Sequence, residues 1–351
     1  MPDGHLAPLR TKNSSEAQNG PAQSEQGCSW VRRVLNGSLT RARRLTRVMV
    51  ALPASVRLET GRGGLPVLLV DGPAARAEIY LHGATVTRWT PSGFDQVLWL
   101  SSASRFTGDA AIRGGVPICF PWFGAQSGHP EAPSHGFARL SQWSLVGAQD
   151  DGTDVTIRLG PTDEDATGAS AWTHRFEAIY TVVVGSRLSL ALQVTNLSDE
   201  TVGFEEALHT YFDVREIRAA EVTGLEGTAF YDRLAGPEPV PGEPDPVRFA
   251  SETDRIYLGT RASTMVRDAE AGRSVLISKD GSDATVVWNP WVDKARAMDD
   301  FGDDEWKRMV CVEVGNIREA TIHLAPGGSH TMMTTFEVSP MTDLEPRSTP
   351  S

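Results

Sequence analysis

The sequence predicts an all-β protein, a large antiparallel β-sandwich, and two observations support this fold class. From about Ser55 to Val338, short apolar or alternating segments follow one another with turn residues between them. Helical periodicity is scarce over the same stretch. The clearest strand is Arg187–Thr195, where apolar side chains recur at every second position, as in a half-buried strand.

The other strands are predicted in chain order. Val67–Val70 is a short apolar run, and Ala77–Leu81 and Thr85–Trp89 flank a hairpin-like break at His82 and Gly83. Further strands are expected at Gln142–Ala148, Val155–Leu159, Phe176–Val184, Val202–Leu208, Ser274–Ser278, Ala284–Trp288, Met309–Val314, Thr321–Leu324 and Thr331–Val338. Asp232–Val247 is rich in Pro, Gly and Glu and predicts a surface loop.

Composition divides the chain into three parts. Residues 53–340 form the predicted sandwich domain, and residues 341–351 a flexible polar tail. Residues 1–52 predict a disordered basic extension, because residues 1–27 are polar and residues 30–50 carry six arginines and no acid. A short basic amphipathic helix is possible in this region. Two explanations stay open: a transit peptide, or a dispensable extension that begins upstream of Met49, which we favour.

Charge and cysteine content exclude several classes of protein. The net charge of −12 argues against a general nucleic-acid binder, although a site can still be locally basic. No apolar run approaches the length of a membrane span. Cys28, Cys119 and Cys311 are odd in number, far apart and without metal-ligand spacing, so a reduced, cytoplasmic setting is expected.

The stretch Ile112–Arg139 is the strongest candidate for a functional site. It holds Arg113, His135 and Arg139 among aromatic residues, repeated glycines and closely spaced prolines. Proline and glycine disfavour a regular central strand or helix, so a rigid loop is predicted. Such a loop presents fixed donors to an anionic, hydroxyl-rich ligand. The alternative, a structural loop that closes one end of a sheet, has about equal weight.

His209 is a second candidate. In an extended chain, Glu205, Ala207, His209 and Tyr211 share one face, which places His209 near a strand end beside an aromatic ring. An imidazole can act as an acid or a base near neutral pH. Taken alone, a structural histidine is the better interpretation.

Glu313 lies in the apolar segment Met309–Val314, where both faces are apolar and burial is expected. A buried carboxylate must be paired or hydrogen-bonded, and its pKa can rise into the range of a general base. A structural glutamate that pairs with an arginine is an equal alternative.

Two weaker candidates complete the set. Trp288 begins the sequence Trp-Asn-Pro-Trp and offers a face on which a sugar can stack, although a tryptophan is as often a core anchor. Asp254 comes just before a predicted short strand, where a turn or cap is the better interpretation from the pattern alone.

In combination these segments resemble a known family. The chain from about Ser55 to Val338 is similar to the glucose-6-phosphate 1-epimerase (D-hexose-6-phosphate mutarotase) family, within the aldose 1-epimerase superfamily. The segments that carry the resemblance are Ile112–Gly124, His135–Arg139, Ala207–Phe212, Asp254–Tyr257, Trp288–Trp291 and Cys311–Glu313. The resemblance implies a galactose mutarotase-like supersandwich, which agrees with the predicted strands.

The resemblance also implies roles for single residues. His209 and Glu313 match the catalytic histidine and glutamate of the family. The implied substrate-binding positions are Arg113, Ser134, His135, Arg139, Asp254 and Trp288. Ser134 is a departure, because some members have a glutamine directly before this histidine, and that substrate contact stays open.

The implied activity is interconversion of the α and β anomers of hexose 6-phosphates by acid–base ring opening and closure. The implied protein needs no metal or organic cofactor, binds no nucleic acid and is expected to be a monomer. Two rival functions remain: a mutarotase for unphosphorylated aldoses, against which the paired arginines argue, and a non-catalytic sugar-phosphate-binding protein.

Overall fold

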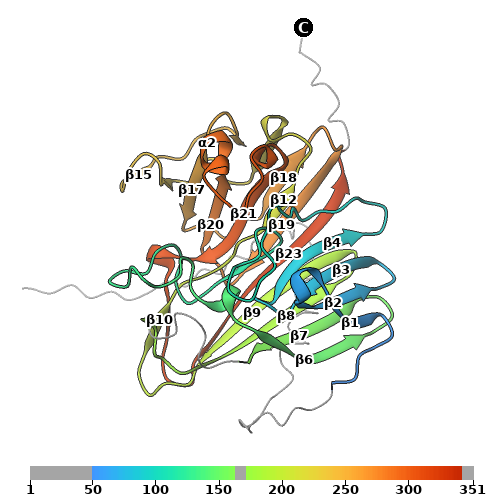
Figure 1. Cartoon of the computed structure of the whole chain (residues 1–351). Coiled ribbons are helices and arrows are strands. Elements are labelled where there is room, and N and C mark those ends of the chain that lie inside the picture. The colour runs from blue at the N-terminus through green and yellow to red at the C-terminus, as the bar shows by residue number, and fades with distance from the viewer. Residues whose placement is uncertain (1–49, 163–170, 342–351) are drawn as a thin grey trace, which may run out of the picture. The chain divides into compact units, whose positions relative to one another are not determined.

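The computed structural model describes residues 50–162 and 171–341 (Figure 1). Most of the predicted basic extension and of the polar tail therefore lies outside the described residues. One short α-helix is present in the described part, α2 (Trp291–Arg296). The described 3₁₀ turns are η1 (Arg62–Gly64), η2 (Ala138–Leu140), η4 (Ile217–Ala219), η5 (Glu305–Arg308) and η6 (Arg318–Ala320). No helix among these residues is long and apolar enough to cross a membrane.

The largest sheet has nine strands, and its named neighbours pair antiparallel. Their order is β16 (Val247–Arg248), β13 (Ala220–Thr223), β18 (Thr264–Asp268), β19 (Arg273–Asp280), β23 (Ser329–Pro340), β9 (Arg187–Asn196), β8 (Phe176–Val184), β7 (Val155–Pro161) and β6 (Trp143–Asp150). The alternating segment predicted at residues 187–195 is β9, and its burial pattern confirms one buried face.

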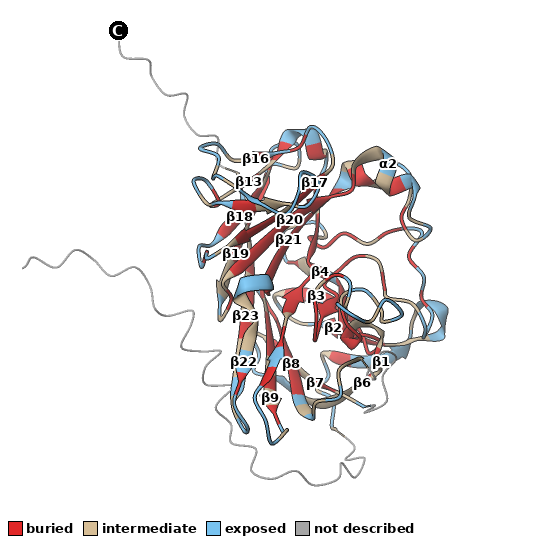
Figure 2. Cartoon of the chain, turned by 90° about the vertical axis from the view of Figure 1, so that its left-hand side faces the viewer, coloured by how far each residue is buried: buried red, intermediate tan, exposed pale blue. Residues whose placement is uncertain are grey.

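A second sheet of eight strands holds most of the candidate residues. Its order is β15 (Pro239–Val240), β14 (Phe230–Asp232), β17 (Thr253–Leu258), β20 (Ala284–Asn289), β21 (Met309–Asn316), β11 (Glu206–Leu208) and β5 (Ile118–Cys119), and β12 (Tyr211–Asp213) also pairs with β21. Every residue of β21 is buried, as predicted from its two apolar faces (Figure 2).

Two smaller sheets complete the fold. One contains β1 (Val56–Thr60), β2 (Pro66–Asp71), β3 (Ala75–Tyr80) and β4 (Thr85–Pro91), and the other pairs β10 (Val202–Phe204) with β22 (Ile322–Leu324). One continuous apolar core contains residues of all four sheets. Phe212 of β12 packs edge to face on Phe336 of β23, and Trp89 of β4 donates to the carbonyl of Gly185 beyond β8. The predicted all-β sandwich is confirmed.

Two local predictions were wrong. The strand predicted over 202–208 is divided at Glu205, whose carboxylate accepts hydrogen bonds from the backbone N–H groups of Phe123 (2.8 Å) and Arg318 (2.6 Å). Asp254 is not a turn or cap residue but lies inside β17. Neither difference is visible in the local pattern, because the partners lie far away in the sequence.

Candidate active site

One row of side chains crosses the eight-stranded sheet. Tyr211 pairs with Cys311, Cys311 with Trp288, and Trp288 with Asp254 in the strand registers. Directly paired residues of an antiparallel sheet project to the same side. The four side chains therefore share one face, although they come from four strands.

A second row on the same face brings Glu313 next to His209. Glu313 pairs with Val286, and Val286 with Ile256. His209 follows β11 directly, and its Nε2 lies 3.4 Å from Oε1 of Glu313. The side chains are only 8% and 2% exposed. The predicted histidine and glutamate thus meet in a nearly dry environment.

The ring of His209 is held on several sides. It stacks on Tyr211 with a centroid distance of 4.7 Å and an interplanar angle of 9°, and the ring of Trp288 meets it edge-on at 6.1 Å. The backbone N–H of His209 donates to the carbonyl of Pro117 at 3.0 Å. Within the described part of the chain, Nδ1 of His209 and Oε2 of Glu313 are buried without a hydrogen-bond partner. Such orphaned atoms are costly in a core and mark a place where a ligand can supply the missing partner.

Burial shifts the pKa values of Glu313 and His209 in opposite directions. It raises the pKa of Glu313 well above its ordinary 4.5; the charge of Asp254 adds to this shift, whereas Arg233 and Arg139 oppose it. Burial lowers the pKa of His209 well below 6.5, and His135, Arg139 and Arg113 lower it further. Without a ligand, burial thus favours the neutral form of both groups, the protonated carboxyl and the uncharged imidazole.

Cys311 lies beside this pair. His209, Cys311 and Glu313 each offer one ligand atom, and these atoms all lie within 4.8 Å of one another. Metal binding requires a thiolate, whereas burial raises the pKa of the Cys311 thiol well above its ordinary value. We assign no metal to this cluster.

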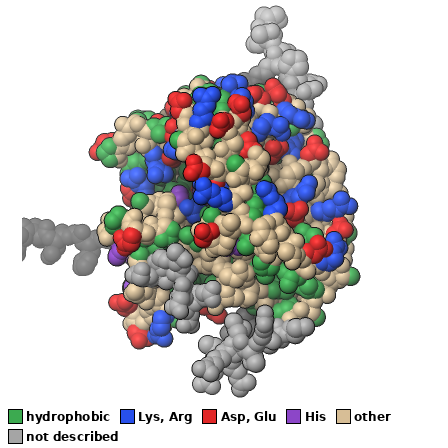
Figure 3. Space-filling model, viewed as in Figure 1, with side chains coloured by type: hydrophobic (Ala, Val, Ile, Leu, Met, Phe, Trp, Pro, Cys, Tyr) green, Lys and Arg blue, Asp and Glu red, His purple; other side chains and the backbone are tan. Residues whose placement is uncertain are grey.

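Arg113 stands at the Tyr211 end of the first row. Its Nη1 donates to the Tyr211 hydroxyl at 3.1 Å, and its Nε and Nη2 contact Asp300 at 3.2 and 3.1 Å. Tyr211 and Asp300 both raise the pKa of the guanidinium, which is charged in any case. Basic and acidic side chains are interspersed over the face of the molecule shown in Figure 3.

Arg139 and His135 come from the predicted loop, whose chain is closely packed. Gly136 has a φ of +73°, and a Cβ there would overlap the Phe120 carbonyl oxygen. That oxygen accepts from the N–H groups of Phe137 (3.0 Å) and Ala138 (3.2 Å). The loop therefore needs glycine at this position, as the sequence analysis expected of a rigid loop.

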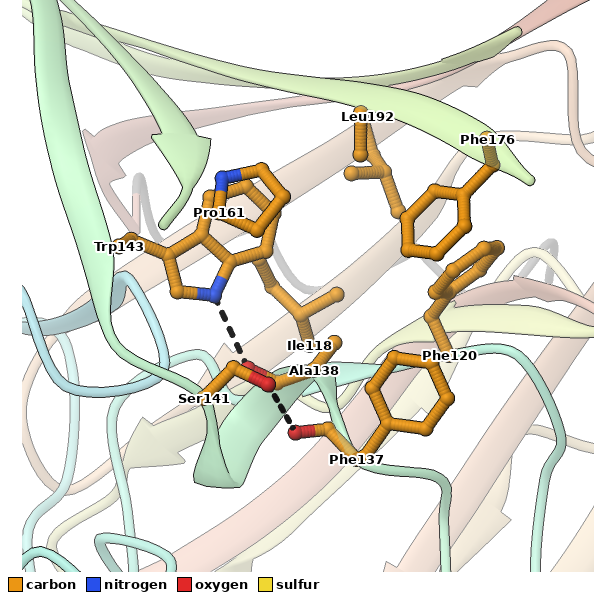
Figure 4. A pocket seen from close by; sticks show the side chains of 10 residues that line it. Ile118, Phe120, Phe137, Ala138, Ser141, Trp143, Pro161, Phe176 and Leu192 are labelled. Carbon is orange, nitrogen blue, oxygen red and sulfur yellow. Dashed lines mark hydrogen bonds between the residues drawn. The ribbon is translucent and has the colours of Figure 1, made fainter. Parts of the chain in front are cut away.

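A small apolar cavity lies next to the C-terminal end of the loop, and two hydrogen bonds beside it anchor that end (Figure 4). Trp143 donates to the carbonyl of Ala138 at 3.0 Å, and Ser141 donates to that of Phe137 at 2.9 Å. The lining is aromatic and aliphatic, which makes the cavity unsuited to a sugar phosphate. It belongs to the scaffold that places Arg139.

The loop's polar groups have few partners of their own. Nη2 of Arg139 donates to the backbone carbonyl of Ser134 at 2.7 Å, while its Nε is buried without a partner among the described residues. His135 accepts from the N–H of Gly124 at 3.3 Å, and its ring lies 5.6 Å from that of His209. Burial, followed by the charge of Arg139, lowers the pKa of His135 well below 6.5. The described contact of Ser134 uses its backbone, not its hydroxyl.

Comparisons with known proteins identify the family to which this chain belongs. The family model described as aldose 1-epimerase matches residues 66–337. The chain belongs to the aldose 1-epimerase family. This is a family of isomerase-class enzymes that interconvert sugar anomers, and membership confirms the resemblance found in the sequence.

Several aldose 1-epimerase relatives share most of their length with this chain. A protein of Cenchrus ciliaris is 36% identical over 289 residues, covering 78% of this chain and 85% of its own, and one of Escherichia coli K12 is 34% identical over 257 residues, covering 73% and 84%. Both carry the provisional name glucose-6-phosphate 1-epimerase. A crystal structure from Salmonella typhimurium, provisionally named a mutarotase, has a TM-score of 0.76 and 29% identity and covers 83% of this chain and 96% of its own.

Some residues of this candidate site were not predicted from the sequence. Asp300 pairs with Arg113, and Glu205 accepts a hydrogen bond from the loop backbone at Phe123. No local sequence pattern identifies either acid. Arg233 was placed in a predicted surface loop. This loop is indeed largely exposed, yet Nη1 of Arg233 lies 3.4 Å from Oδ2 of Asp254. The sequence around Arg233 gave little indication of a role in the site, because a single arginine after a short strand is common.

Proposed function

We propose that this protein is a glucose-6-phosphate 1-epimerase that interconverts the α and β anomers of D-hexose 6-phosphates. The observation that carries the proposal is the buried His209–Glu313 contact of 3.4 Å on a face shared with Asp254, in a site also reached by the charges of Arg113 and Arg139. The names of the relatives from Cenchrus ciliaris and Escherichia coli support the same substrate class.

The chemistry requires two proton transfers at neighbouring oxygens. In ring opening, Glu313 as carboxylate takes the proton of the anomeric hydroxyl, the bond between C1 and the ring oxygen breaks, and His209 as imidazolium delivers a proton to the ring oxygen. The product is the open-chain aldehyde. Both oxygens are bonded to C1, so the acid and the base must lie side by side, as these two side chains do.

Ring closure reverses the transfers. After rotation about the C1–C2 bond, the hydroxyl on the former ring oxygen attacks the other face of the aldehyde. His209 takes its proton, and Glu313 returns a proton to the anomeric oxygen. The pair ends with the one proton it began with, so a full cycle needs no external acid or base.

Substrate binding supplies the protonation state that ring opening needs. The pair must carry its single proton on His209, whereas burial in the empty site favours an uncharged imidazole and a protonated carboxyl. Arg113 and Arg139 are among the groups that lower the pKa of His209. A phosphate dianion bound to these arginines offsets their charge and favours the imidazolium. This gives the phosphate a role in catalysis as well as in binding.

The remaining predicted residues would position the sugar. Asp254, buried and negatively charged, would accept hydrogen bonds from hydroxyl groups, and the Trp288 ring would pack beneath the sugar. His135, whose Nδ1 already accepts from Gly124, would offer its other ring nitrogen. Ser134, which is exposed, would reach less far than a glutamine.

The cellular setting belongs to the same proposal. Cys119 and Cys311 are buried as free thiols, which suits a reducing compartment, and the proposed substrate is an intracellular type of metabolite. We therefore place the enzyme in the cytoplasm. A monomer stays a prediction, to be checked by light scattering after size exclusion.

NMR exchange spectroscopy of glucose 6-phosphate tests the function directly. The wild-type protein should accelerate exchange between the two anomers, and His209→Ala should lose most of this acceleration. Faster exchange with free glucose than with glucose 6-phosphate would instead indicate a mutarotase for unphosphorylated aldoses. Binding of the sugar phosphate without acceleration would indicate a binding protein.

A further inference from the structure

Arg233 continues the first row of site residues beyond the end of β14. The last residue pair that joins β14 to β17 is Asp232 with Arg255, so the next pair along this register is Arg233 with Asp254. The backbone N–H of Arg233 donates to the carbonyl of Asp254 at 2.9 Å, which extends the pairing by one step. Paired residues project to the same side, and Arg233 therefore lies on the site face.

The side chains of this pair have very different exposure. Nη1 of Arg233 lies 3.4 Å from Oδ2 of Asp254, and the two side chains are 43% and 7% exposed. Among the described residues, Arg233 is the one cation that forms a salt bridge with Asp254. The nearby Lys294 contacts Glu252 instead, at 2.7 Å. The orientation of the buried carboxylate thus depends on a single arginine at the rim.

The charges around Asp254 show why it needs a cation. Burial raises its pKa; Glu252 and Asp232 raise it further, and Arg233 is the strongest opposing influence, followed by Lys294. Glu313 lies on the same face of the sheet in the strand register, and the charge of Asp254 raises its pKa while that of Arg233 lowers it. A carboxylate in this position is stable as an anion only with a fixed counter-charge.

We propose that Arg233 is a positioning residue for the sugar: it holds the Asp254 carboxylate ionised and turned into the site, where that carboxylate accepts hydrogen bonds from sugar hydroxyls. This inference rests on the proposed function, because Asp254 serves as the hydroxyl acceptor there. It extends that function by a residue that acts through Asp254 and does not touch the reacting atoms. A direct contact between Arg233 and the phosphate is the competing role.

A double-mutant cycle separates the two roles. Arg233→Ala, Asp254→Asn and the double variant are compared with wild type for KM and kcat on glucose 6-phosphate. We expect Arg233→Ala to raise KM by about 10-fold with a smaller effect on kcat, the size of one charge-assisted hydrogen bond. In the Asp254→Asn background, removing Arg233 should change KM little, and Arg233→Lys alone should recover part of the loss. An undiminished loss in that background would overturn the proposal and indicate direct phosphate binding.

The pH dependence of KM gives a second readout. Loss of Arg233 raises the pKa of Asp254, so the rise in KM on acidification should begin at a higher pH in Arg233→Ala than in wild type. The matched control is Arg261→Ala, because Arg261 also pairs with an acid, Asp283, but is 81% exposed. Identical KM–pH curves for wild type and Arg233→Ala would overturn the proposal.

A non-reacting ligand keeps this test separate from that of the function. The probe is 1,5-anhydroglucitol 6-phosphate, which has no anomeric hydroxyl, measured by calorimetry with the same variants. Loss of affinity in Arg233→Ala without any wild-type catalysis would leave the positioning role standing and overturn the epimerase proposal. Wild-type catalysis with equal analogue affinity in wild type and Arg233→Ala would overturn the positioning role and leave the epimerase proposal standing. Absence of both catalysis and analogue binding in wild type would overturn both.

Discussion

Nε2 of His209 lies 3.4 Å from Oε1 of Glu313, and each side chain keeps its other polar atom buried without a partner among the described residues. The contact joins the end of β11 to the middle of β21. A structural ion pair of this depth normally satisfies its remaining atoms. The unsatisfied atoms favour a site that a ligand completes.

Removing either member of the pair should abolish most of the catalysis. We expect Glu313→Gln and His209→Asn each to lower kcat for glucose 6-phosphate by about 10²–10⁴-fold, because each supplies one proton transfer. Exchange spectroscopy measures the rate, and calorimetry with the anhydro analogue checks that binding persists. The control is Glu206→Gln, which removes another fully buried carboxyl from the neighbouring strand. Full activity in Glu313→Gln would contradict the assignment.

The pH profile should be bell-shaped, because the active pair holds one proton. The acid limb, where a second proton binds, should lie well below pH 6.5, since the pKa of His209 is lowered. The basic limb, where the last proton leaves, should lie well above pH 4.5, since the pKa of Glu313 is raised. Asp254→Asn removes a negative charge that raises the pKa of Glu313, so its basic limb should move to lower pH. An unmoved limb, measured from kcat/KM between pH 4 and 10, would argue against this coupling.

The free energy of unfolding should show the cost of burying the Glu313 carboxyl group. A carboxyl whose pKa is higher in the folded state stabilises the fold fully below the unfolded value of 4.5, and this contribution is lost as pH rises through the folded value. Glutamine cannot ionise. Glu313→Gln should therefore be more stable than wild type by about 1–3 kcal/mol near neutral pH, a Tm increase of several degrees. Calorimetric scans at several pH values check this, and an equal Tm throughout would contradict it.

Arg139 should matter for the phosphorylated substrate in particular. Its charge is paired with a backbone carbonyl rather than an acid in the described structure, so it is available to an anion. Arg139→Ala should raise KM for glucose 6-phosphate by about 10–100-fold and lower kcat less, because a charge-assisted bond to the phosphate is lost. Arg261→Ala, at an exposed ion pair, is the control. Unchanged affinity in Arg139→Ala would remove this residue from the phosphate site.

The loop that carries Arg139 should tolerate no side chain at Gly136. Gly136 and Gly124 both have positive φ, +73° and +74°, yet a Cβ at Gly136 would overlap the Phe120 carbonyl, whereas at Gly124 it would meet nothing within 4 Å. Both alanine variants place a Cβ in the left-handed region, which costs about 1–2 kcal/mol. Gly136→Ala should lose more stability and also affinity for the sugar phosphate. Similar melting curves for the two variants would contradict this prediction, because they would show that the loop backbone moves to accommodate a Cβ at residue 136.

The amino-acid sequence alone was enough to predict the fold class and most residues of the candidate site. Alternating segments such as Arg187–Thr195 report their own burial, because side chains of a strand point to opposite faces with a period of two. The apolar run around Glu313 likewise predicted a fully buried strand. The resemblance to a family added candidate roles for His209, Glu313 and the two arginines, and membership of the aldose 1-epimerase family is now shown.

Which side chains face each other, and in which direction burial shifts their pKa values, becomes defined in the tertiary structure. Residues such as Arg233 and Asp254, or Arg113 and Asp300, meet through strand register and loop packing, which local patterns do not encode. The opposite pKa shifts of His209 and Glu313 have the same origin. Desolvation depends on how completely the surrounding strands and rings exclude water, and this becomes defined only when distant segments pack together.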